Sequence, residues 1–135
     1  MSGLVLIMED EMDMRFYLTA LVTSMGLTPE VTRNGAAGLA ALAEKKEQVE
    51  LIILDVMMPE KGGAWVYREL KTHADFRHIP LVIFSGVEAT SFHHYVKMIN
   101  AETGLDLPMP DYYVEKTADP EYLKKIIHQS LERIS

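Results

Sequence analysis

The stretch LIILDVMMPEK, residues 51–61, decides the fold, because four aliphatic residues run directly into a single aspartate. A short apolar run of this kind is typical of a strand buried on both faces of a parallel sheet. Asp55 then stands where the strand ends. Because a buried carboxylate is costly unless another group compensates it, Asp55 is either a capping residue or part of a site.

Similar apolar runs and helical patterns alternate along the rest of the chain. Two more buried strands are predicted at LVLIM (4–8) and IPLVIF (79–84), and weaker ones at 28–32 and 112–114. Helices are predicted between them, over residues 11–25, 34–46, 63–73, 88–102 and 120–134. This alternation predicts one α/β domain over residues 1–135, doubly wound and flavodoxin-like, with a five-stranded parallel sheet in the order 2-1-3-4-5.

Turn and cap residues support these boundaries. Gly26 and Gly104 each follow a predicted helix, where glycine commonly ends one. Asn34 and Asp119 each precede a predicted helix, where a side-chain oxygen can accept from a free amide.

Composition excludes several classes of function. The formal net charge of −7 disfavours direct binding to a nucleic acid backbone. There is no cysteine, so disulfides and thiolate zinc sites are excluded. No apolar run approaches the ~20 residues that a membrane helix needs, so we expect no membrane insertion and a cytoplasmic location.

Acidic residues follow the strands that flank the point where strand order reverses, which is where such sheets bind ligands. Glu9 and Asp10 follow the first strand, and Asp55 follows the third. Each alone would be an ordinary loop acid or helix cap, but three together predict a site. Oxygen ligands without nearby histidine suit Mg²⁺, and a carboxylate beside Mg²⁺ can act as a nucleophile toward a phosphoryl group. Ser85 and Lys116 end the fourth and fifth strands at the same edge.

At this point the sequence resembles a response-regulator receiver domain of two-component signalling, of the stand-alone, chemotaxis-regulator-like kind. The resemblance covers essentially the whole chain. It rests on the combination of four segments, any one of which would be weak alone: LVLIMEDE, LIILDVMMPEKGG, LVIFSG and YYVEK.

The resemblance implies how the acids work. Asp55 is expected to accept a phosphoryl group from the phosphohistidine of a histidine kinase or phosphotransfer protein. Asp10 is expected to bind Mg²⁺ (or Mn²⁺) directly, Glu9 directly or through water, and Met57 through its backbone carbonyl. The domain would then catalyse its own phosphorylation and dephosphorylation, without turnover of a separate substrate.

The resemblance also implies a switch. Ser85 is expected to hydrogen-bond the phosphoryl oxygens, Lys116 to pair with them, and Tyr113 to change rotamer as Ser85 moves. The output face of the family, formed by the fourth helix, fifth strand and fifth helix, would then bind a downstream protein.

Three features depart from the family pattern. Thr117 follows Lys116 where the family usually has proline, so a cis bond there is not expected. Gly62 stands where the family commonly has aspartate. The segment between Ser85 and Lys116 is longer than usual, and Pro108 and Pro110 favour a loop within it.

Two other kinds of function remain open at this stage. An enzyme on the same architecture, either a dehalogenase-type phosphatase or a flavodoxin, is disfavoured because Met57 replaces the second aspartate of the former and EDEMD replaces the phosphate loop of the latter. A receiver-like module that binds its partner without phosphorylation is the closer alternative, and the long segment before the fifth strand is its main support.

Overall fold

The computed structural model describes residues 3–57, 62–116 and 118–132, and strands alternate with helices along them. Five parallel strands form one sheet in the order β2-β1-β3-β4-β5, which confirms the predicted fold class. The strands are β1 (Leu4–Met8), β2 (Thr28–Thr32), β3 (Val49–Leu54), β4 (Leu81–Ser85) and β5 (Tyr112–Glu115). β4 begins later than predicted, after Pro80, which has no amide to donate to a neighbouring strand.

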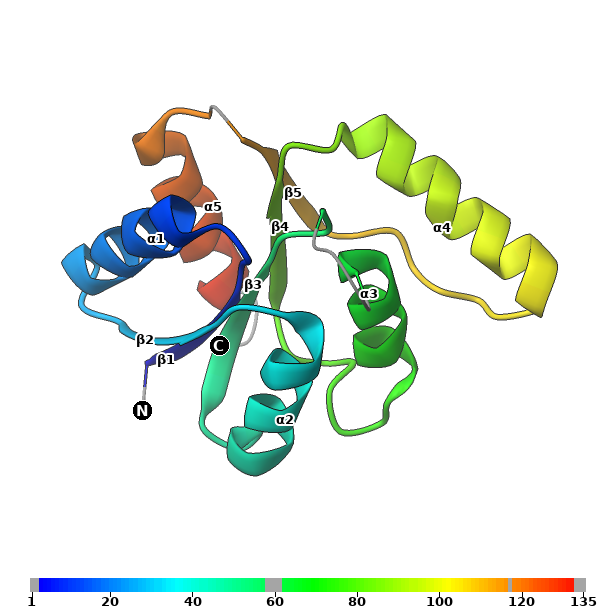
Figure 1. The fold of residues 1–135 in the computed structure, drawn as a ribbon, viewed down its shortest axis with the longest axis horizontal. Helices are drawn as coiled ribbons and strands as arrows, with labels where there is room; N and C mark the ends of the chain where they lie inside the picture. The colour runs from blue at the N-terminus through cyan, green and yellow to red at the C-terminus, as the bar shows by residue number, and fades with distance from the viewer. Residues whose placement is uncertain (1–2, 58–61, 117, 133–135) are drawn as a thin grey trace.

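Helices cover both faces of the sheet (Figure 1). The helices are α1 (Met12–Ser24), α2 (Gly35–Lys45), α3 (Gly63–Thr72), α4 (Ala89–Thr103) and α5 (Pro120–Glu132). α1 and α5 pack on one face, and α2, α3 and α4 on the other. Each lies within a residue or two of its predicted range, and the last residues of the prediction for α5, 133–134, lie outside the described part of the chain.

Two apolar layers result from the alternation of side chains along the buried strands. In β1, Leu6 and Met8 point into the layer below α2, α3 and α4, whereas Val5 and Ile7 point into the layer below α1 and α5. All four are fully buried. β1 is therefore apolar at every position, and β3 is apolar from Leu51 to Leu54, as the uninterrupted runs predict.

The predicted caps are also observed. The Ala37 amide donates to Asn34 Oδ1 at 2.7 Å, and the Glu121 amide donates to Asp119 Oδ1 at 2.8 Å. Gly26 and Gly104 have φ angles of 79° and 76°, in the left-handed region that glycine adopts without strain.

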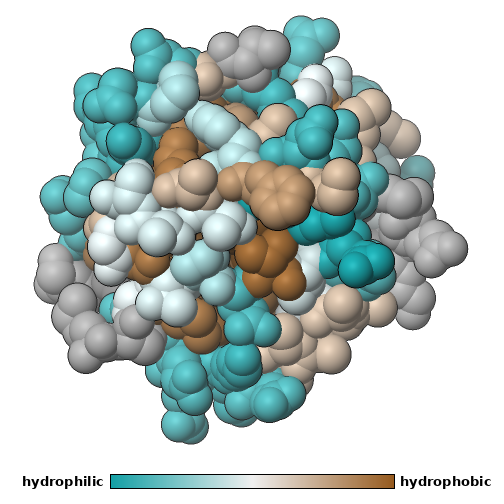
Figure 2. Space-filling view, turned by 60° about the vertical axis from the view of Figure 1, so that its left-hand side comes forward, coloured by the Kyte–Doolittle hydropathy of each residue, from teal (hydrophilic) through white to brown (hydrophobic). Residues whose placement is uncertain are grey.

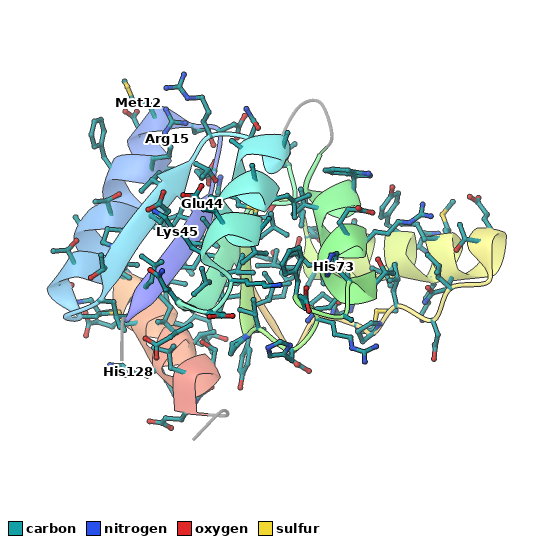
Figure 3. The ribbon with its side chains drawn as sticks, turned by 90° about the horizontal axis from the view of Figure 1, so that it is seen from below. Met12, Arg15, Glu44, Lys45, His73 and His128 are labelled. Carbon is teal, nitrogen blue, oxygen red and sulfur yellow. The ribbon has the colours of Figure 1, made fainter. Side chains whose placement is uncertain are left out.

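α4 and the segment that follows it distinguish this domain. α4 has 15 residues, the most of any described helix, and it projects away from the other helices (Figures 1 and 3). Residues 104–111, which we call the strap, run back from its end to β5 as an extended loop. The extra length between β4 and β5 therefore forms both a long helix and a long loop.

None of the helices in the described part of the chain combines the length and the apolar character that a membrane span requires.

Candidate functional site

The sheet brings the predicted acids to one edge. β1 and β3 are neighbours, with Met8 paired to Leu54, so the residues that follow them emerge side by side. The Asp55 amide extends the pairing by donating to the Met8 carbonyl at 3.1 Å. On the other side, the Lys116 amide donates to the Ser85 carbonyl at 2.8 Å. All the predicted strand-end residues thus lie at the carboxyl edge of the sheet.

The Lys116 ammonium lies among the carboxylates. Its Nζ is 3.1 Å from Asp55 Oδ2, 3.1 Å from Glu9 Oε1 and 3.2 Å from Glu11 Oε1. Asp55 and Glu9 are buried, with 2% and 1% of their surface exposed, whereas Glu11 is exposed. The cation therefore compensates two carboxylates that burial would otherwise make costly, which answers the question raised by Asp55 in the sequence.

Burial changes the protonation of this cluster. Loss of solvent, and then repulsion by Asp55, raise the pKa of the Glu9 carboxyl to about 7. Burial alone would lower the pKa of Lys116, but its close contacts with the Asp55 and Glu9 carboxylates outweigh burial and raise this pKa above its ordinary value. The lysine is therefore charged at neutral pH, while Glu9 is poised between its two forms.

The acidic cluster has the composition of a site for a hard divalent cation. Carboxylate oxygens of Glu9, Glu11 and Asp55 all lie within 4.8 Å of one another. Asp10 falls outside this group, but its Oδ1 atom is buried and accepts no hydrogen bond among the described residues. Glu9 Oε1 likewise accepts none, despite its ion-pair distance to Lys116. Acceptor oxygens that receive no hydrogen bond in a buried acidic cluster fit a cation such as Mg²⁺.

Two residues of this site were not predicted. Glu11 contacts Lys116, and its place directly after the acid pair was the signal that could have identified it. Arg15, near the beginning of α1 (Figure 3), donates through Nη1 to the carbonyls of Glu9 and Asp10 at 3.1 and 2.6 Å. It fixes the turn that carries both acids. The spacing between Arg15 and these acids carries no recognisable pattern, because the contacts are to main-chain atoms.

The turn after Asp55 is held close to α3. The Met57 amide donates to Asp55 Oδ1 at 2.9 Å, and the Met57 side chain is exposed. Gly63 begins α3 so near to this turn that a Cβ there would lie 2.1 Å from Val56 Cα. Residues 58–61, which carry the Met-Pro part of the motif, lie outside the described residues, as does Thr117 with its bond to Lys116.

Ser85 and Tyr113 are connected through the loop after β4. The Val87 amide donates to Ser85 Oγ at 3.2 Å, and the Tyr113 hydroxyl donates to the Val87 carbonyl at 2.6 Å. Ser85 is fully buried, and burial raises the pKa of Tyr113 to about 12, so its hydroxyl remains a donor at neutral pH. The two residues predicted to form a switch are therefore joined by two hydrogen bonds in this structure.

Comparison with known proteins agrees with this geometry. The family described as "Response regulator receiver domain" matches residues 5–128. The chain is 31% identical over 129 residues to the probable transcriptional regulator ycf27 of Cyanidium caldarium, covering 96% of this chain and 46% of that protein. It is 30% identical to the probable transcriptional regulatory protein SilR of Salmonella typhimurium, covering 90% and 48%. The chain thus spans about half the length of these curated relatives.

Solved structures show the same fold. A response regulator receiver domain protein from Clostridium thermocellum superposes with a TM-score of 0.78 at 19% identity, covering 96% of this chain and 94% of that one. The chemotaxis protein CheY4 of Vibrio cholerae superposes with a TM-score of 0.74 at 20% identity, covering 95% and 98%. The family match extends over nearly the whole chain, and this chain belongs to the response regulator receiver domain family.

Proposed function

We propose that Asp55 accepts a phosphoryl group from the phosphohistidine of a histidine kinase or a phosphotransfer protein. The observation that carries this proposal is the placement of Asp55, buried at the end of β3 with the Lys116 ammonium 3.1 Å from its Oδ2 atom. In the reaction an Asp55 oxygen forms a bond to phosphorus as the bond from phosphorus to the histidine nitrogen breaks, and the histidine leaves as a neutral imidazole after gaining a proton.

The acid cluster would hold the divalent cation that this reaction needs. Glu9, Asp10 and Asp55 would supply carboxylate oxygens, and Met57 its backbone carbonyl. When bound, Mg²⁺ (or Mn²⁺) neutralises negative charge on the phosphoryl oxygens. Lys116 would balance part of the same charge, since it already pairs with Asp55 before transfer.

Phosphorylation would redirect the groups that surround Asp55. A phosphoryl group adds nearly two negative charges and strong acceptors, to which the Ser85 hydroxyl can donate. The Ser85 hydroxyl now accepts from the Val87 amide, so a new position of Ser85 would displace the loop after β4. Tyr113, whose hydroxyl donates to the Val87 carbonyl, would follow it.

Two surfaces suit the protein partners of such a domain. On α1, Met12 and Phe16 are 60% and 68% exposed at successive turns beside the acid cluster, where a phosphohistidine donor must approach. Figure 2 brings the face with α1 and α5 forward and shows apolar side chains lying between polar ones. The downstream partner would bind on α4, β5 and α5, where Tyr95 and Met98 of α4 are exposed.

Acetyl phosphate with Mg²⁺, followed by intact-mass spectrometry, tests the phosphorylation. We expect one phosphoryl adduct on the wild-type chain and none on Asp55→Asn. Asp13→Asn is a matched control, because Asp13 is an exposed acid of α1 outside the cluster. An adduct that persists in Asp55→Asn, or its absence from the wild type with acetyl phosphate and with histidine kinases, contradicts the proposal.

The alternative is a receiver-like module that binds its partner without phosphorylation. The long α4 and the strap favour it, because α4 is part of the usual output face and the strap leads from α4 into β5. A partner that binds the wild type and Asp55→Asn equally, in the presence and absence of acetyl phosphate, would support this second function.

A further inference from the structure

A row of contacts begins at the switch and continues beyond it. The first two are the hydrogen bonds from Val87 to Ser85 and from Tyr113 to Val87, at 3.2 and 2.6 Å. The Tyr113 ring then packs against the Phe92 ring of α4, with 5.8 Å between ring centroids. Phe92 is 3% exposed, so it cannot move without displacing its neighbours.

The row crosses from α4 to α3 through a second pair of rings. Phe92 meets Tyr67 edge to face, with centroids 5.3 Å apart and planes at 86°, the arrangement that aromatic pairs favour. Tyr67 is 1% exposed and lies one turn after Gly63, which contacts the backbone of Asp55 and Val56. Tyr67 therefore contacts Phe92 of α4 and belongs to the helix that begins beside the turn after Asp55.

The row ends on the strap. The Tyr67 hydroxyl donates to the Pro108 carbonyl at 2.5 Å, across 41 positions of sequence. One residue earlier, Leu107 is 4% exposed, and its backbone makes a pair of hydrogen bonds with the Asn100 side chain, at 2.8 and 3.1 Å. The strap is thus attached to α3 by Tyr67 and to α4 by Asn100.

We propose that the strap is a phosphorylation-responsive part of the surface of this domain, coupled to Asp55 through Tyr113, Phe92 and Tyr67. The inference rests on the proposed phosphorylation of Asp55. When Ser85 donates to a phosphoryl oxygen, the Val87 loop and Tyr113 shift, and the packed rings carry the displacement to Tyr67. Tyr67 then loses its aligned bond to Pro108, and the strap loosens on the side of α3.

This coupling would extend the surface by which a partner protein recognises the phosphorylated domain. The strap lies against α3, so the responsive region would extend past α4 in the direction away from α5 (Figure 1). Its exposed residues include Asp106 and Pro108. A partner that recognises the state of the domain could therefore bind the strap and the outer half of α4.

Amide exchange of Leu107, followed by NMR, tests the coupling, because this amide lies one residue before the Pro108 carbonyl that Tyr67 holds, and its own bond to Asn100 should open more often once the strap is released from α3. We expect exchange at least about three-fold faster after phosphorylation by acetyl phosphate and Mg²⁺, in a sample whose adduct is confirmed by mass. In Tyr67→Phe we expect the adduct to form, exchange to be fast already in the resting state, and phosphorylation to add no further change.

Tyr95→Phe is the matched control, since it removes the hydroxyl of an exposed tyrosine on α4 and should behave as the wild type. An adduct on the wild type with unchanged or slower Leu107 exchange overturns the coupling and leaves the proposed function standing. A response in Tyr67→Phe as large as in the wild type overturns the role of Tyr67. Absence of the adduct overturns the proposed function and the coupling together.

Discussion

Replacing Gly63 with alanine tests how tightly the turn after Asp55 is built. An added Cβ would lie 2.1 Å from Val56 Cα and 2.5 Å from the Asp55 carbonyl oxygen, whereas ordinary contacts begin at 3.4 Å. Both obstacles are backbone atoms, so no side-chain rotation relieves the overlap. Overpacking costs roughly 1–3 kcal/mol, and we expect Gly63→Ala to reach about 3 kcal/mol because α3 or the turn must move.

Two other glycines calibrate this expectation. A Cβ at Gly38 would meet the Met8 side chain, with its sulfur at 2.5 Å, and a flexible thioether can move aside. Alanine also favours the interior of a helix by about 1 kcal/mol over glycine, so the net loss in Gly38→Ala should be about 1 kcal/mol or less. A Cβ at Gly86 would meet nothing within 4 Å, and Gly86→Ala should stay within about 0.5 kcal/mol of the wild type.

Urea unfolding of the three variants measures the order directly, since the midpoint changes with stability while the slope reports the surface exposed. Gly63→Ala should also be phosphorylated more slowly by acetyl phosphate, because a displaced Val56 carries Asp55 with it. A free energy of unfolding for Gly63→Ala within about 0.5 kcal/mol of the wild type, or above that of Gly38→Ala, refutes the reasoning.

Three further predictions concern the charges and the lifetime of the site. Lys116→Met leaves two buried carboxylates unpaired, so its free energy of unfolding, measured in urea at pH 7, should be about 3 kcal/mol lower than that of the wild type. This difference should shrink near pH 5, and an equal difference at both pH values contradicts the prediction. In the metal-free protein the pKa of Glu9 is raised from 4.5 to about 7 on folding. Its contribution to the free energy of unfolding is therefore complete below pH 4.5 and is lost as the pH rises through 7. Glu9→Gln should therefore flatten the stability profile between these values, and an unchanged profile contradicts the assignment. The phosphoryl group should be lost slowly, because Met57 and Val87, which stand two positions after Asp55 and Ser85, are apolar and cannot position a hydrolytic water. Rapid loss of the phosphoryl group from the purified protein, at a rate that substitution of either residue leaves unchanged, refutes this prediction.

The fold could be predicted from the sequence because its signals are local and agree with one another. Uninterrupted apolar runs such as residues 51–54 are required by a strand with helices on both faces, and Asn34 and Gly26 mark helix ends by their own backbone chemistry. Only the exact limits of the strands and helices differed. β3 begins at Val49 because Glu50, a half-buried acid, still fits a strand position, although it interrupts the apolar pattern.

The site was predicted to a smaller extent, because strand ends indicate which residues meet but not how they pair. The convergence of Glu9, Asp55 and Lys116 follows from the topology alone. That Glu11 pairs with Lys116, while the Asp10 carboxylate lies outside the group formed by Glu9, Glu11 and Asp55, depends on the turn held by Arg15. Contacts to backbone carbonyl oxygens determine such turns. Because every residue has a carbonyl oxygen, no residue type in the sequence indicates where such a contact will form.

The same reason explains why the attachment of the strap was not foreseen. Pro108 and Pro110 predicted a loop correctly, but the group that fixes the loop is the carbonyl of Pro108, and its partner is a tyrosine that also reads as a core residue of α3. Proline makes this contact easier to form, because its fixed φ angle reduces the freedom that the strap loses on attachment. The hydroxyl of Tyr67 would otherwise be buried without an acceptor, at a cost of roughly 1–3 kcal/mol. The hydrogen bond that satisfies the buried Tyr67 hydroxyl therefore also fixes the strap to α3, and a displacement of Tyr67 must move or release the strap.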